Sequence, residues 1–490
     1  MSDELPQGWI TAPLAKIAEA RMGETILAKQ LTPTGIPVFS AGAENNPWGF
    51  LENPRKPLGK GTVVVSARGS IGFPKIPKAE RFASTQTTIA LRFPDEELAA
   101  YGCLWLKTVN WSALTKGGAI PMLTVGDINE IEVPLAPLAE QRRILAKLEK
   151  LLGQVDACQQ RLAKIPILLK RFRQSVLAAA CSGRLTADWR EENDCTEDAD
   201  ALLDRMKLER RERWAIENGN RKYREADPVA DEELPTVPET WRWTNFDHCA
   251  WEITVGHVGP MKDRYVEKGV TFLRCQNVRP LKFDTDGLVH IPTDFHKQLS
   301  KSELLGGEIL VVRSGANTGD CCVFPRNLGS ANCSDLVITR PLSGLLPEYG
   351  ALYVNSPAGQ ALLTLNQTGI AQPHFNIGAM RVKAFPLPPL AEQQEIVRRV
   401  EGLFALADQL EVRLAKAQSR VSGITPSLLA RAFRGALVPQ DPNDEPASEL
   451  LARIRGEKTN QTQRGASGIY QASQRRRRKN LAGADISTLV

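Results

Sequence analysis

The chain has 490 residues and a formal net charge of +6, with 62 lysines and arginines against 56 aspartates and glutamates. That length allows about three or four domains, and the mildly basic charge is compatible with nucleic-acid binding without requiring it. The longest apolar runs, such as Thr62–Val65 and Ile309–Val312, are too short to cross a bilayer. Met1–Glu4 is polar and acidic, unlike a signal peptide. We therefore expect a soluble cytoplasmic protein that does not contact a membrane.

The first predicted domain opens with Leu5–Trp9 (LPQGW), in which a tryptophan follows proline and turn residues. Further along, the β-branched run Thr62–Val65 predicts a buried strand. The polar, glycine-containing residues Arg68–Ser70 that follow it predict a loop, and Thr85–Phe93 predicts another strand. Short strands separated by glycine-rich loops indicate a domain of mixed α and β structure.

The next segment occurs twice in the chain. Pro134–Gln141 reads PLAPLAEQ and Pro386–Gln393 reads PLPPLAEQ, and the two copies stay in register without a gap for about fifty residues. Apolar residues then recur at steps of three, four or seven, as at Ile144 and Leu148. This spacing predicts a long amphipathic helix after each motif.

Each predicted helix is too long for its own domain to bury the apolar stripe. A helix that continues past Pro166 to Ser182 would be roughly 65 Å long. We therefore expect the two copies to pack against each other as an antiparallel coiled coil, with Gly183 and Gly435 as the C-terminal stops. Two independent helices are the alternative, which the gapless repeat disfavours. The duplication predicts approximate twofold symmetry within one chain.

Between the copies, Thr186–Glu233 is strongly charged and poor in β-branched residues. We interpret it as a connector whose charges keep it in solvent, with Asp200–Asn218 as a solvated helix. A second domain of short strands follows, with strands predicted at Ile309–Val312 and Ser334–Arg340. The polar end of the chain contains the basic run Arg475–Lys479, which indicates a mobile tail.

The predicted fold class is α+β, with two domains of short strands joined by the pair of long helices. The predicted boundaries are 1–134 for the first domain, 135–185 for the first helix, 186–233 for a charged helical linker, 234–386 for the second domain, 387–438 for the second helix and 439–490 for the basic tail.

The sequence lacks the motifs of the common catalytic and metal-binding sites. No phosphate-binding GxxxxGK[ST] loop, no Asn-Pro-Pro-aromatic tetrapeptide and no HExxH pair is present. The nine cysteines include no CxxC, so reduced thiols are expected rather than a zinc site. We predict no catalytic residue and no metal site, which favours a protein that binds or positions.

The double PLxPLAEQ motif, each copy followed by an amphipathic helix, resembles the specificity subunit of type I restriction–modification enzymes. The resemblance extends from Leu5 to about Val438. In the second domain, Phe272–Val278 (FLRCQNV) is similar to the family's Leu-Arg-x-x-Asn-aliphatic motif, whereas the first domain has Ile36–Gly42 (IPVFSAG) at the comparable place. This difference predicts two subtypes of domain and therefore two different half-sites.

The resemblance implies that each α+β domain is a target recognition domain for double-stranded DNA. The helix pair is then a spacer that fixes the distance between half-sites and docks two methyltransferase subunits, with two restriction subunits in the full complex. No cofactor is expected on this chain, because S-adenosylmethionine, ATP and Mg are implied for the partner subunits.

Candidate DNA contacts lie on polar loops, since arginine suits guanine edges and phosphate, and asparagine and glutamine suit adenine edges. Most contacts to DNA go to its backbone, so each is expected to position more often than to specify, and bracing of loops is the alternative role. In the first domain the candidates are Ser66, Arg68, Ser70, Lys116 and Thr124. In the second domain they are Arg274, Gln276, Asn277, Arg313, Ser314, Asn317, Gln372 and His374.

Paired Glu-Gln residues begin both helices, where these residue types favour the first turn. We therefore interpret them as capping or partner-docking residues and not as catalytic ones. The predicted docking and spacer set is Leu138, Glu140, Gln141, Ile144, Leu148, Leu390, Glu392, Gln393, Ile396 and Leu403.

Two other functions are compatible with the same features. A stand-alone regulator would use the two domains to bind DNA tightly without a methyltransferase. A coiled-coil scaffold would enrich no two-part motif from random DNA.

Overall fold

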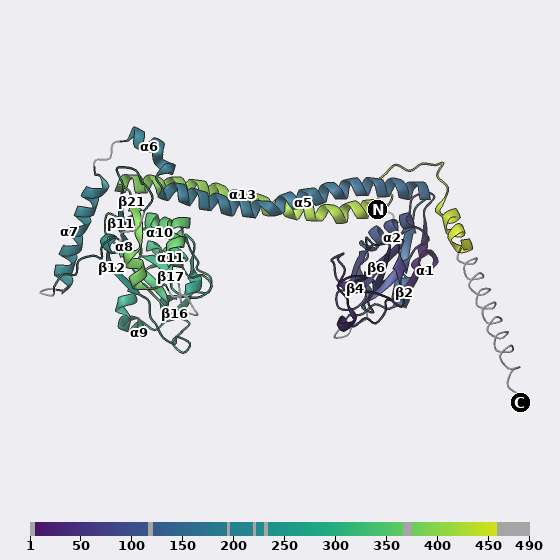
Figure 1. Ribbon diagram of the computed structural model, residues 1–490, viewed down its shortest axis with the longest axis horizontal. Helices are drawn as coiled ribbons and strands as arrows, with labels where there is room; N and C mark the ends of the chain where they lie inside the picture. Colours follow the sequence, from purple (N-terminus) through teal and green to yellow (C-terminus); the bar gives the residue numbers. More distant parts are fainter. Residues whose placement is uncertain are drawn as a thin grey trace, which may run out of the picture. The chain divides into compact units, whose positions relative to one another are not determined.

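The computed structural model describes residues 5–115, 121–193, 197–218, 222–229, 234–365 and 375–457. The chain forms two compact units (Figure 1). The first unit consists of Met1–Ala163 together with Lys416–Val490, and the second consists of Lys164–Ala415. Each unit therefore contains one α+β domain and a section of each long helix.

The domain of the first unit is built on two four-stranded sheets. The antiparallel sheet has the order β2-β9-β6-β7, with bounds β2 (Glu19–Met22), β9 (Thr88–Arg92), β6 (Thr62–Ser66) and β7 (Gly72–Lys75). The mixed sheet has the order β4-β3-β8-β5, with bounds β4 (Gly49–Leu51), β3 (Ile36–Phe39), β8 (Arg81–Ser84) and β5 (Leu58–Gly59). The short helices are α1 (Leu14–Ile17), α2 (Glu96–Leu106), α3 (Trp111–Leu114) and α4 (Val125–Asn129). A further pair, β1 (Ile10–Pro13) with β10 (Glu132–Leu135), is antiparallel and leads into the first long helix.

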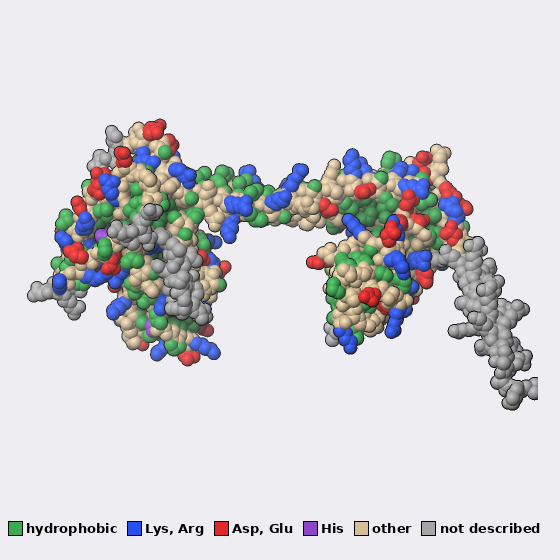
Figure 2. All heavy atoms as spheres, in the orientation of Figure 1, with side chains coloured by type: hydrophobic (Ala, Val, Ile, Leu, Met, Phe, Trp, Pro, Cys, Tyr) green, Lys and Arg blue, Asp and Glu red, His purple; other side chains and the backbone are tan. Residues whose placement is uncertain are grey.

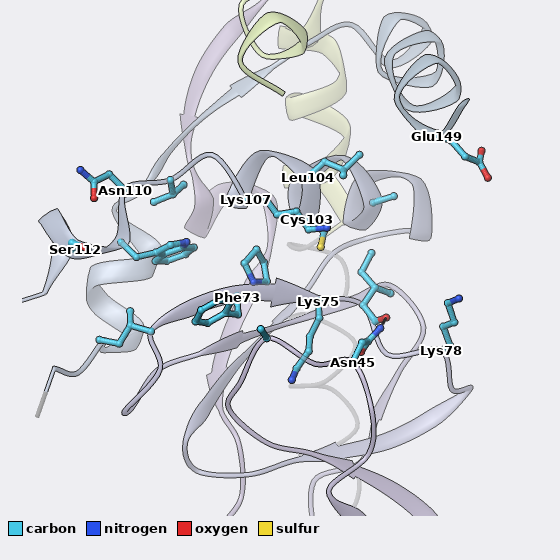
Figure 3. Close-up of a pocket in the computed structure, with 17 residues that line it drawn as sticks. Asn45, Phe73, Lys75, Lys78, Cys103, Leu104, Lys107, Asn110, Ser112 and Glu149 are labelled. Carbon is cyan, nitrogen blue, oxygen red and sulfur yellow. Dashed lines mark hydrogen bonds between the residues drawn. The ribbon is translucent and has the colours of Figure 1, made fainter. Parts of the chain in front are cut away.

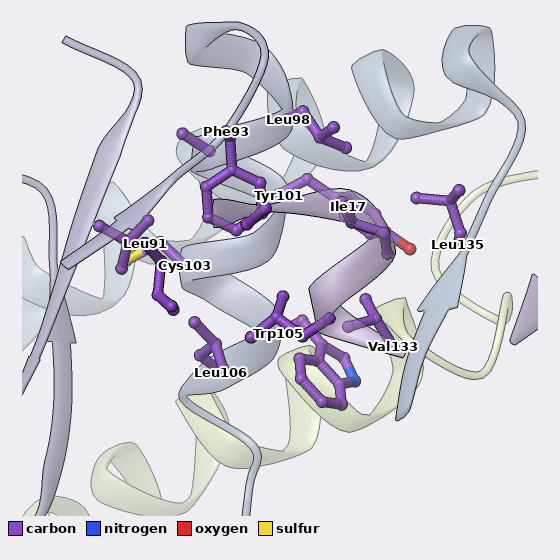
Figure 4. Close-up of a cluster of buried hydrophobic side chains, with 14 of the residues drawn as sticks. Ile17, Leu91, Phe93, Leu98, Tyr101, Cys103, Trp105, Leu106, Val133 and Leu135 are labelled. Atoms are coloured by element: carbon purple, nitrogen blue, oxygen red, sulfur yellow. The ribbon is translucent and has the colours of Figure 1, made fainter. Parts of the chain in front are cut away.

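The central strand β6 shows why its sequence is a continuous β-branched run. Val63 and Val65 face the main core under α2, and Val64 faces a smaller core on the other side of the sheet. Successive side chains alternate between faces, so a strand covered on both sides needs apolar residues throughout. Figure 4 shows the main core, where Tyr101 of α2 also donates a hydrogen bond of 2.8 Å from its hydroxyl to the Pro134 carbonyl.

The domain of the second unit repeats the antiparallel sheet and three strands of the mixed sheet. Its antiparallel sheet has the order β12-β20-β17-β18, with bounds β12 (Ala250–Val255), β20 (Leu336–Pro341), β17 (Ile309–Val312) and β18 (Cys321–Val323). The mixed sheet is β16 (Val289–Ile291), β13 (Val270–Leu273) and β19 (Ala331–Cys333). The smaller pairs are β14 (Val278–Arg279) with β15 (Lys282–Phe283), and β11 (Arg242–Asn245) with β21 (Ala384–Leu387). The helices are α8 (Phe246–Cys249), α9 (Thr293–Gln298), α10 (Pro347–Asn355), α11 (Pro357–Leu365) and α12 (Ile377–Val382).

Matching strands pair in matching ways in the two domains. β3 is parallel to β8 and antiparallel to β4, just as β13 is parallel to β19 and antiparallel to β16. The segments with unlike motifs, IPVFSAG and FLRCQNV, therefore begin with equivalent strands. The domains differ in their loops and also in two additions, the strand β5 in the first domain and the pair β14–β15 in the second.

The two long helices are α5 (Leu138–Cys181) and α13 (Leu390–Ala432), which lie side by side in Figure 1. In the first unit, Ile144 and Leu148 of α5 share a core with Leu429 of α13. In the second unit, Val176 of α5 shares a core with Ile396 of α13. Low numbers on one helix meet high numbers on the other, which confirms the predicted antiparallel pair. The helix α5 continues through Pro166 and, with 44 residues, is about 66 Å long.

The predicted helix stops are confirmed and have two causes. Gly183 and Gly435 adopt left-handed backbone conformations, with φ of 76° and 70°, which glycine adopts without strain. A Cβ atom at Gly183 would lie 2.4 Å from the ring of Pro238, and one at Gly435 would lie 2.2 Å from the ring of Pro6. In each unit the chain leaving one long helix thus passes close to the entrance of the domain.

The segments after these glycines are more than the connector and tail that their composition predicts. After α6 (Ala187–Glu192), the helix α7 (Ala199–Asn218) buries Leu202 and Met206 in the second core. The helical residues 447–457 bury Leu450 and Ile454 in the first core. The interpretation of 186–233 as a solvated linker is therefore corrected for α7, and that of 439–490 as a mobile tail is corrected for residues 447–457. Arg475–Lys479 lies outside the described residues.

Within the part of the chain that the structure describes, no helix is long and apolar enough to cross a membrane.

Candidate nucleic-acid interface

The candidate residues of the first domain gather around the loop between β6 and β7. Arg68 and Ser70 are exposed on this loop, where Gly69 has a φ of 76°. The backbone N–H of Leu123 donates to the Ala67 carbonyl over 2.9 Å, which brings the segment of Thr124 beside the loop. Thr124 is exposed, but its side chain and that of Asp127 cap α4 reciprocally. Lys116 lies outside the described residues.

In the second domain the described candidates lie on two loops, one after β13 and one after β17, and both loops bond to the Asp335 carbonyl. The thiol of Cys275, in the loop after β13, donates to the Asp335 carbonyl over 3.5 Å. The backbone N–H of Arg313, after β17, donates to the same carbonyl over 3.2 Å. Gln276 is exposed, and the half-buried candidates at these loops are Arg274, Arg313, Ser314 and Asn317. Gln372 and His374 lie outside the described residues.

Ser66 and Asn277 are removed from the candidate interface, because both side chains are completely buried. The Ser66 hydroxyl accepts a hydrogen bond of 2.9 Å from the Gly42 backbone N–H. The Asn277 amide oxygen accepts from the Arg274 backbone N–H over 2.9 Å, and its NH₂ group donates to the carbonyls of Asp284 and Asp286. Both residues brace loops, which was the alternative role for Asn277.

The Arg274 guanidinium already has two partners within its own domain. Its guanidinium donates to the Gly287 carbonyl over 2.6 Å and lies 5.9 Å from the centre of the Tyr265 ring. For Arg313, the described residues provide no hydrogen bond or ion pair to the guanidinium. Arg313 is therefore the better candidate for a charge that meets DNA.

A lysine that the sequence did not single out holds the loop after β3, residues 40–44, in place. The Lys75 ammonium donates to the carbonyls of Ser40, Gly42 and Glu44, over 2.9, 3.1 and 2.8 Å. Burial lowers the pKa of Lys75, although the nearby Glu44 opposes this shift. The same loop contacts Ser66, so these two buried side chains together determine its position.

A hollow of about 1070 Å³ lies between α2 and β7 of the first unit, with Phe73, Lys107 and Asn110 on its walls (Figure 3). In the second domain, side chains of α10 and α11 bond to the start of β18 and to the loop before it. Asn355 donates to the Cys321 carbonyl over 2.8 Å and Gln360 to the Gly319 carbonyl over 3.0 Å.

The glutamates of the repeated motif are buried and join three parts of each unit. Glu140 accepts hydrogen bonds from the Trp9 indole N–H over 2.8 Å and from the Gln440 amide over 2.7 Å. Glu392 accepts from the Trp241 indole N–H over 2.7 Å and from the Thr186 hydroxyl over 2.6 Å. Each glutamate thus connects a domain entrance, the start of one long helix and the segment that follows the other.

The second glutamate has a direct ion-pair partner that the first lacks. The Arg190 guanidinium forms an ion pair with Glu392, whereas the Arg143 guanidinium near Glu140 bonds to Asp444 instead. Burial raises the pKa of the Glu140 carboxyl, although the hydrogen bonds from Trp9 and Gln440 act in the opposite direction.

The predicted docking set is largely inside the protein. Completely or almost completely buried are Glu140, Gln141, Ile144, Leu148, Glu392, Gln393 and Ile396. Half-buried against the cores are Leu138, Leu390 and Leu403. A partner cannot reach the first group, so partner docking is corrected to an internal role for these residues.

The exposed apolar residues of the long helices lie elsewhere. In the second unit they include Leu168 (57 % exposed) and Phe172 (37 %) on α5, and Leu406 (51 %) and Leu410 (41 %) on α13. The sequence carries this signal, because each pair is spaced by four residues beside the buried stripe.

Among the residues that the structure describes, no group of three or more His, Cys, Asp or Glu side chains is placed to hold a metal ion. Thiol chemistry is also disfavoured where cysteines are buried. Burial raises the pKa of the Cys103 thiol to about 11, so it is protonated at neutral pH.

Comparisons with known proteins agree in pointing to one family. The family described as "Type I restriction modification DNA specificity domain" matches residues 6–166. The Type I restriction enzyme EcoBI specificity subunit of Escherichia coli is 31% identical over 390 residues, which cover 76% of this chain and 72% of the relative. The EcoDI specificity subunit of Escherichia coli is 27% identical, with 96% of this chain and 99% of the relative covered.

Two solved structures share the fold. One, described as "Structural basis underlying complex assembly and conformational transition of the type I R-M system", has a TM-score of 0.59 at 18% identity, and the match covers 89% of this chain and all of the other. The HsdS subunit from Thermoanaerobacter tengcongensis has a TM-score of 0.51 at 18% identity, covering 89% of this chain and 98% of the other.

Proposed function

The chain belongs to the family of type I restriction–modification specificity subunits, and we propose that it reads a two-part, asymmetric DNA target through its two recognition domains. Its role as a DNA sequence-recognition subunit follows from this membership, and so does its non-catalytic character. The proposal adds which parts of the chain contact DNA and what the helix pair does.

One observation carries the proposal: two domains with the same pairing of their central strands present unlike residues from equivalent loops. The loop after β6 presents Arg68 and Ser70, whereas the loop after β17 presents Arg313, Ser314 and Asn317. Base edges are distinguished by the side chains that reach them, whereas contacts to phosphates carry no sequence information directly. Equivalent loops with different side chains therefore favour two half-sites of different sequence.

The helix pair is proposed to set the distance between the half-sites. Half-sites read from the same side of B-DNA lie about 34 Å apart, one helical turn. A helix of about 66 Å provides a rigid element on that scale. Lengthening both helices together should therefore lengthen the unread gap in the target.

The partner subunits are proposed to supply the chemistry. Two methyltransferase subunits, which hold S-adenosylmethionine, dock on the helix pair, and two restriction subunits that use ATP and Mg join them in the cytoplasm. The exposed leucines of α5 and α13 support docking, because apolar side chains at the surface of a helix pair favour contact with another protein.

The test is enrichment of bound sequences from random DNA with the chain and its methyltransferase. We expect a motif of two unlike parts separated by a fixed gap. Arg313→Ala should weaken selection of one part by roughly 5- to 150-fold, as expected for the loss of about 1–3 kcal/mol, and Arg68→Ala should affect the other part. Ser302→Ala, which changes a buried side chain away from both loops, is the control. A single continuous motif, or no enrichment, would contradict the proposal and favour a scaffold.

A further inference from the structure

The hollow between α2 and β7 of the first unit has the size and the lining of a ligand site (Figure 3). Its volume is about 1070 Å³. Small-molecule sites in proteins are hollows of roughly 300–1,000 Å³ with mainly apolar walls and a few polar groups. Here the walls include the apolar side chains of Ile71, Leu104 and Val109 and the amides of Asn45 and Asn110.

Two aromatic side chains border the hollow without stacking on any other ring. Phe73 is 46 % exposed. Trp111 lies against Gly72, where an added Cβ atom would be 2.5 Å from the Trp111 Cδ1 atom. Among the described residues, neither Phe73 nor Trp111 contacts another aromatic ring or a guanidinium. The two rings are therefore able to stack on a planar ligand in the hollow.

The backbone of Phe73 is strained where the side chain enters the hollow. Its φ is 50°, a left-handed conformation that is rare for a bulky residue. Val64 pairs with Lys75 and Ser66 pairs with Gly72, so β7 has one residue more than β6 between these pairs. Such a bulge turns a side chain away from the sheet, and bulges recur beside functional sites. The strained, half-exposed ring indicates a role outside the core of the protein.

The charged groups of the hollow favour a negatively charged ligand. Lys78 and Lys107 are exposed, and within the described part of the chain neither ammonium has a hydrogen bond or an ion pair. Lys75 is not available, because its ammonium donates to three backbone carbonyls. Glu149 is the one acidic residue among those that line the hollow. Two unpaired cations against one carboxylate attract an anion and repel a cation.

The hollow adjoins the loop that is proposed to contact DNA. Ile71 and Phe73, which line it, closely follow Arg68 and Ser70 along the chain. A planar apolar ring joined to an anionic group is the chemistry of a nucleotide. DNA presents such a group when one nucleotide is rotated out of the base stack.

We propose that this hollow is a nucleotide-binding site, in which the base stacks on Phe73 and Trp111 and the phosphate binds the ammonium of Lys78 or Lys107. The nucleotide comes either from the first half-site, extruded from the duplex, or from solution. The first source rests on the proposed function, whereas the second does not. With the first source, the domain reads one base outside the helical stack in addition to those that its loops contact.

The first experiment is a calorimetric titration of the full-length chain with each of the four deoxynucleoside 5′-monophosphates. At least one should saturate a single site. Deoxyribose 5-phosphate, which has no base to stack, should bind at least roughly tenfold more weakly. Lys78→Ala with Lys107→Ala should weaken binding of the nucleotide at least roughly tenfold. Lys16→Ala with Lys29→Ala removes the same charge from exposed lysines outside the hollow and should not.

Phe73→Gly separates a role in binding from a role in folding. Glycine adopts a φ of 50° without strain, so relief of strain offsets the lost contacts and thermal unfolding should change little. Loss of the stacking ring should weaken nucleotide binding by roughly 5- to 150-fold. Phe73→Tyr keeps the ring and should bind normally. Normal binding by the folded Phe73→Gly variant would overturn the inference.

The source of the nucleotide is decided in the complex of the chain with its methyltransferase and the DNA target. The duplex carries 5-iodopyrimidines or 8-bromopurines, one position at a time, which crosslink to aromatic side chains on irradiation. A crosslink to Phe73 or Trp111 from the first half-site, located by mass spectrometry, identifies an extruded nucleotide. No such crosslink, together with saturable binding of a monophosphate, identifies a free nucleotide.

Failure of the inference is distinguishable from failure of the proposed function. If neither a crosslink nor saturable binding is found, the hollow is not a nucleotide site, while a two-part motif selected from random DNA leaves the proposed function standing. If no motif is selected, the proposed function fails, and the titration with monophosphates alone decides the inference.

Discussion

Glu140 and Glu392 occupy the same position of the repeat, but the side chains that bond to the two carboxyl groups differ between the units. Glu392 has a hydroxyl, an indole N–H and the Arg190 guanidinium as partners, whereas Glu140 has an indole N–H and the neutral amide of Gln440. The comparison teaches that duplication preserved the buried carboxylate and its tryptophan. The third partner, which comes from a segment of unlike sequence, was free to change.

The largest expected effect comes from removing the ion-paired glutamate. Glu392→Ala leaves the Arg190 guanidinium without its buried counter-charge and should cost about 3–5 kcal/mol. Glu140→Ala strands only neutral donors and should cost about 1–3 kcal/mol. Urea unfolding, with hydrogen exchange of peptides from each unit, measures both values. Equal losses of stability in the two variants would show that the ion pair with Arg190 does not make Glu392 more costly to remove than Glu140.

The next prediction concerns a substitution that should destabilise the two units equally. Ile144 and Ile396 are equivalent and both completely buried. Ile144→Ala and Ile396→Ala should each cost about 2–5 kcal/mol, because each leaves a cavity. The same unfolding measurement should give values within about 1 kcal/mol of each other. A larger disagreement would mean that one core collapses around the cavity and the other does not.

A smaller effect is the pH dependence of the first unit. The pKa of the Glu140 carboxyl is raised from its ordinary value of 4.5 when the protein folds. The unfolded chain therefore ionises first as the pH rises, and stability should fall between 4.5 and the raised value, then level off. The side chain of the Glu140→Gln variant cannot ionise. Its free energy of unfolding, relative to that of the unaltered chain, should therefore rise across that pH window. Free energies of unfolding at several pH values provide the test, and a constant difference would contradict it.

The smallest effect concerns an ion pair present in one unit alone. In the second unit, Arg173 bonds to Asp408 and Glu411 over 2.5 and 2.6 Å. The equivalent residue of the first unit is Thr425, opposite Asp156. Arg173→Met should cost about 1 kcal/mol or less, because both carboxylates are exposed. Thr425→Arg should stabilise the first unit by a similar amount, and thermal unfolding at low and high salt would detect both changes.

The sequence predicted the elements that local patterns specify. The antiparallel helix pair followed from the repeated apolar stripe, and the buried strands followed from β-branched runs such as that of β6. The packed helices after Gly183 and Gly435 were misjudged, because only a few apolar residues, such as Leu202 and Leu450, interrupt a charged composition.

The role of Glu140 and Glu392 was missed for a different reason. Trp9 and Gln440 are 131 and 300 residues from Glu140 along the chain, so no local pattern connects them. A signal did exist in the repeat, since a tryptophan opens both domains and a glutamate begins both helices. The partners of Ser66 and Asn277 are nearer, at 24 residues for Ser66 and at 3, 7 and 9 residues for Asn277, but polar residues in a loop have the same composition whether they face solvent or brace the loop.

The division of the chain between the units has a consequence for its synthesis. One uninterrupted stretch, 164–415, forms the second unit, whereas the first unit needs both ends of the chain. On the ribosome, the second unit is therefore complete before Leu429 and Phe433 have been added. Until then Tyr101 lacks the aromatic ring of Phe433, whose centre lies 5.2 Å from its own, and Leu148 lacks Leu429. The amino-terminal half thus waits with an uncovered hydrophobic surface, which makes it the part of the nascent polypeptide most in need of a chaperone.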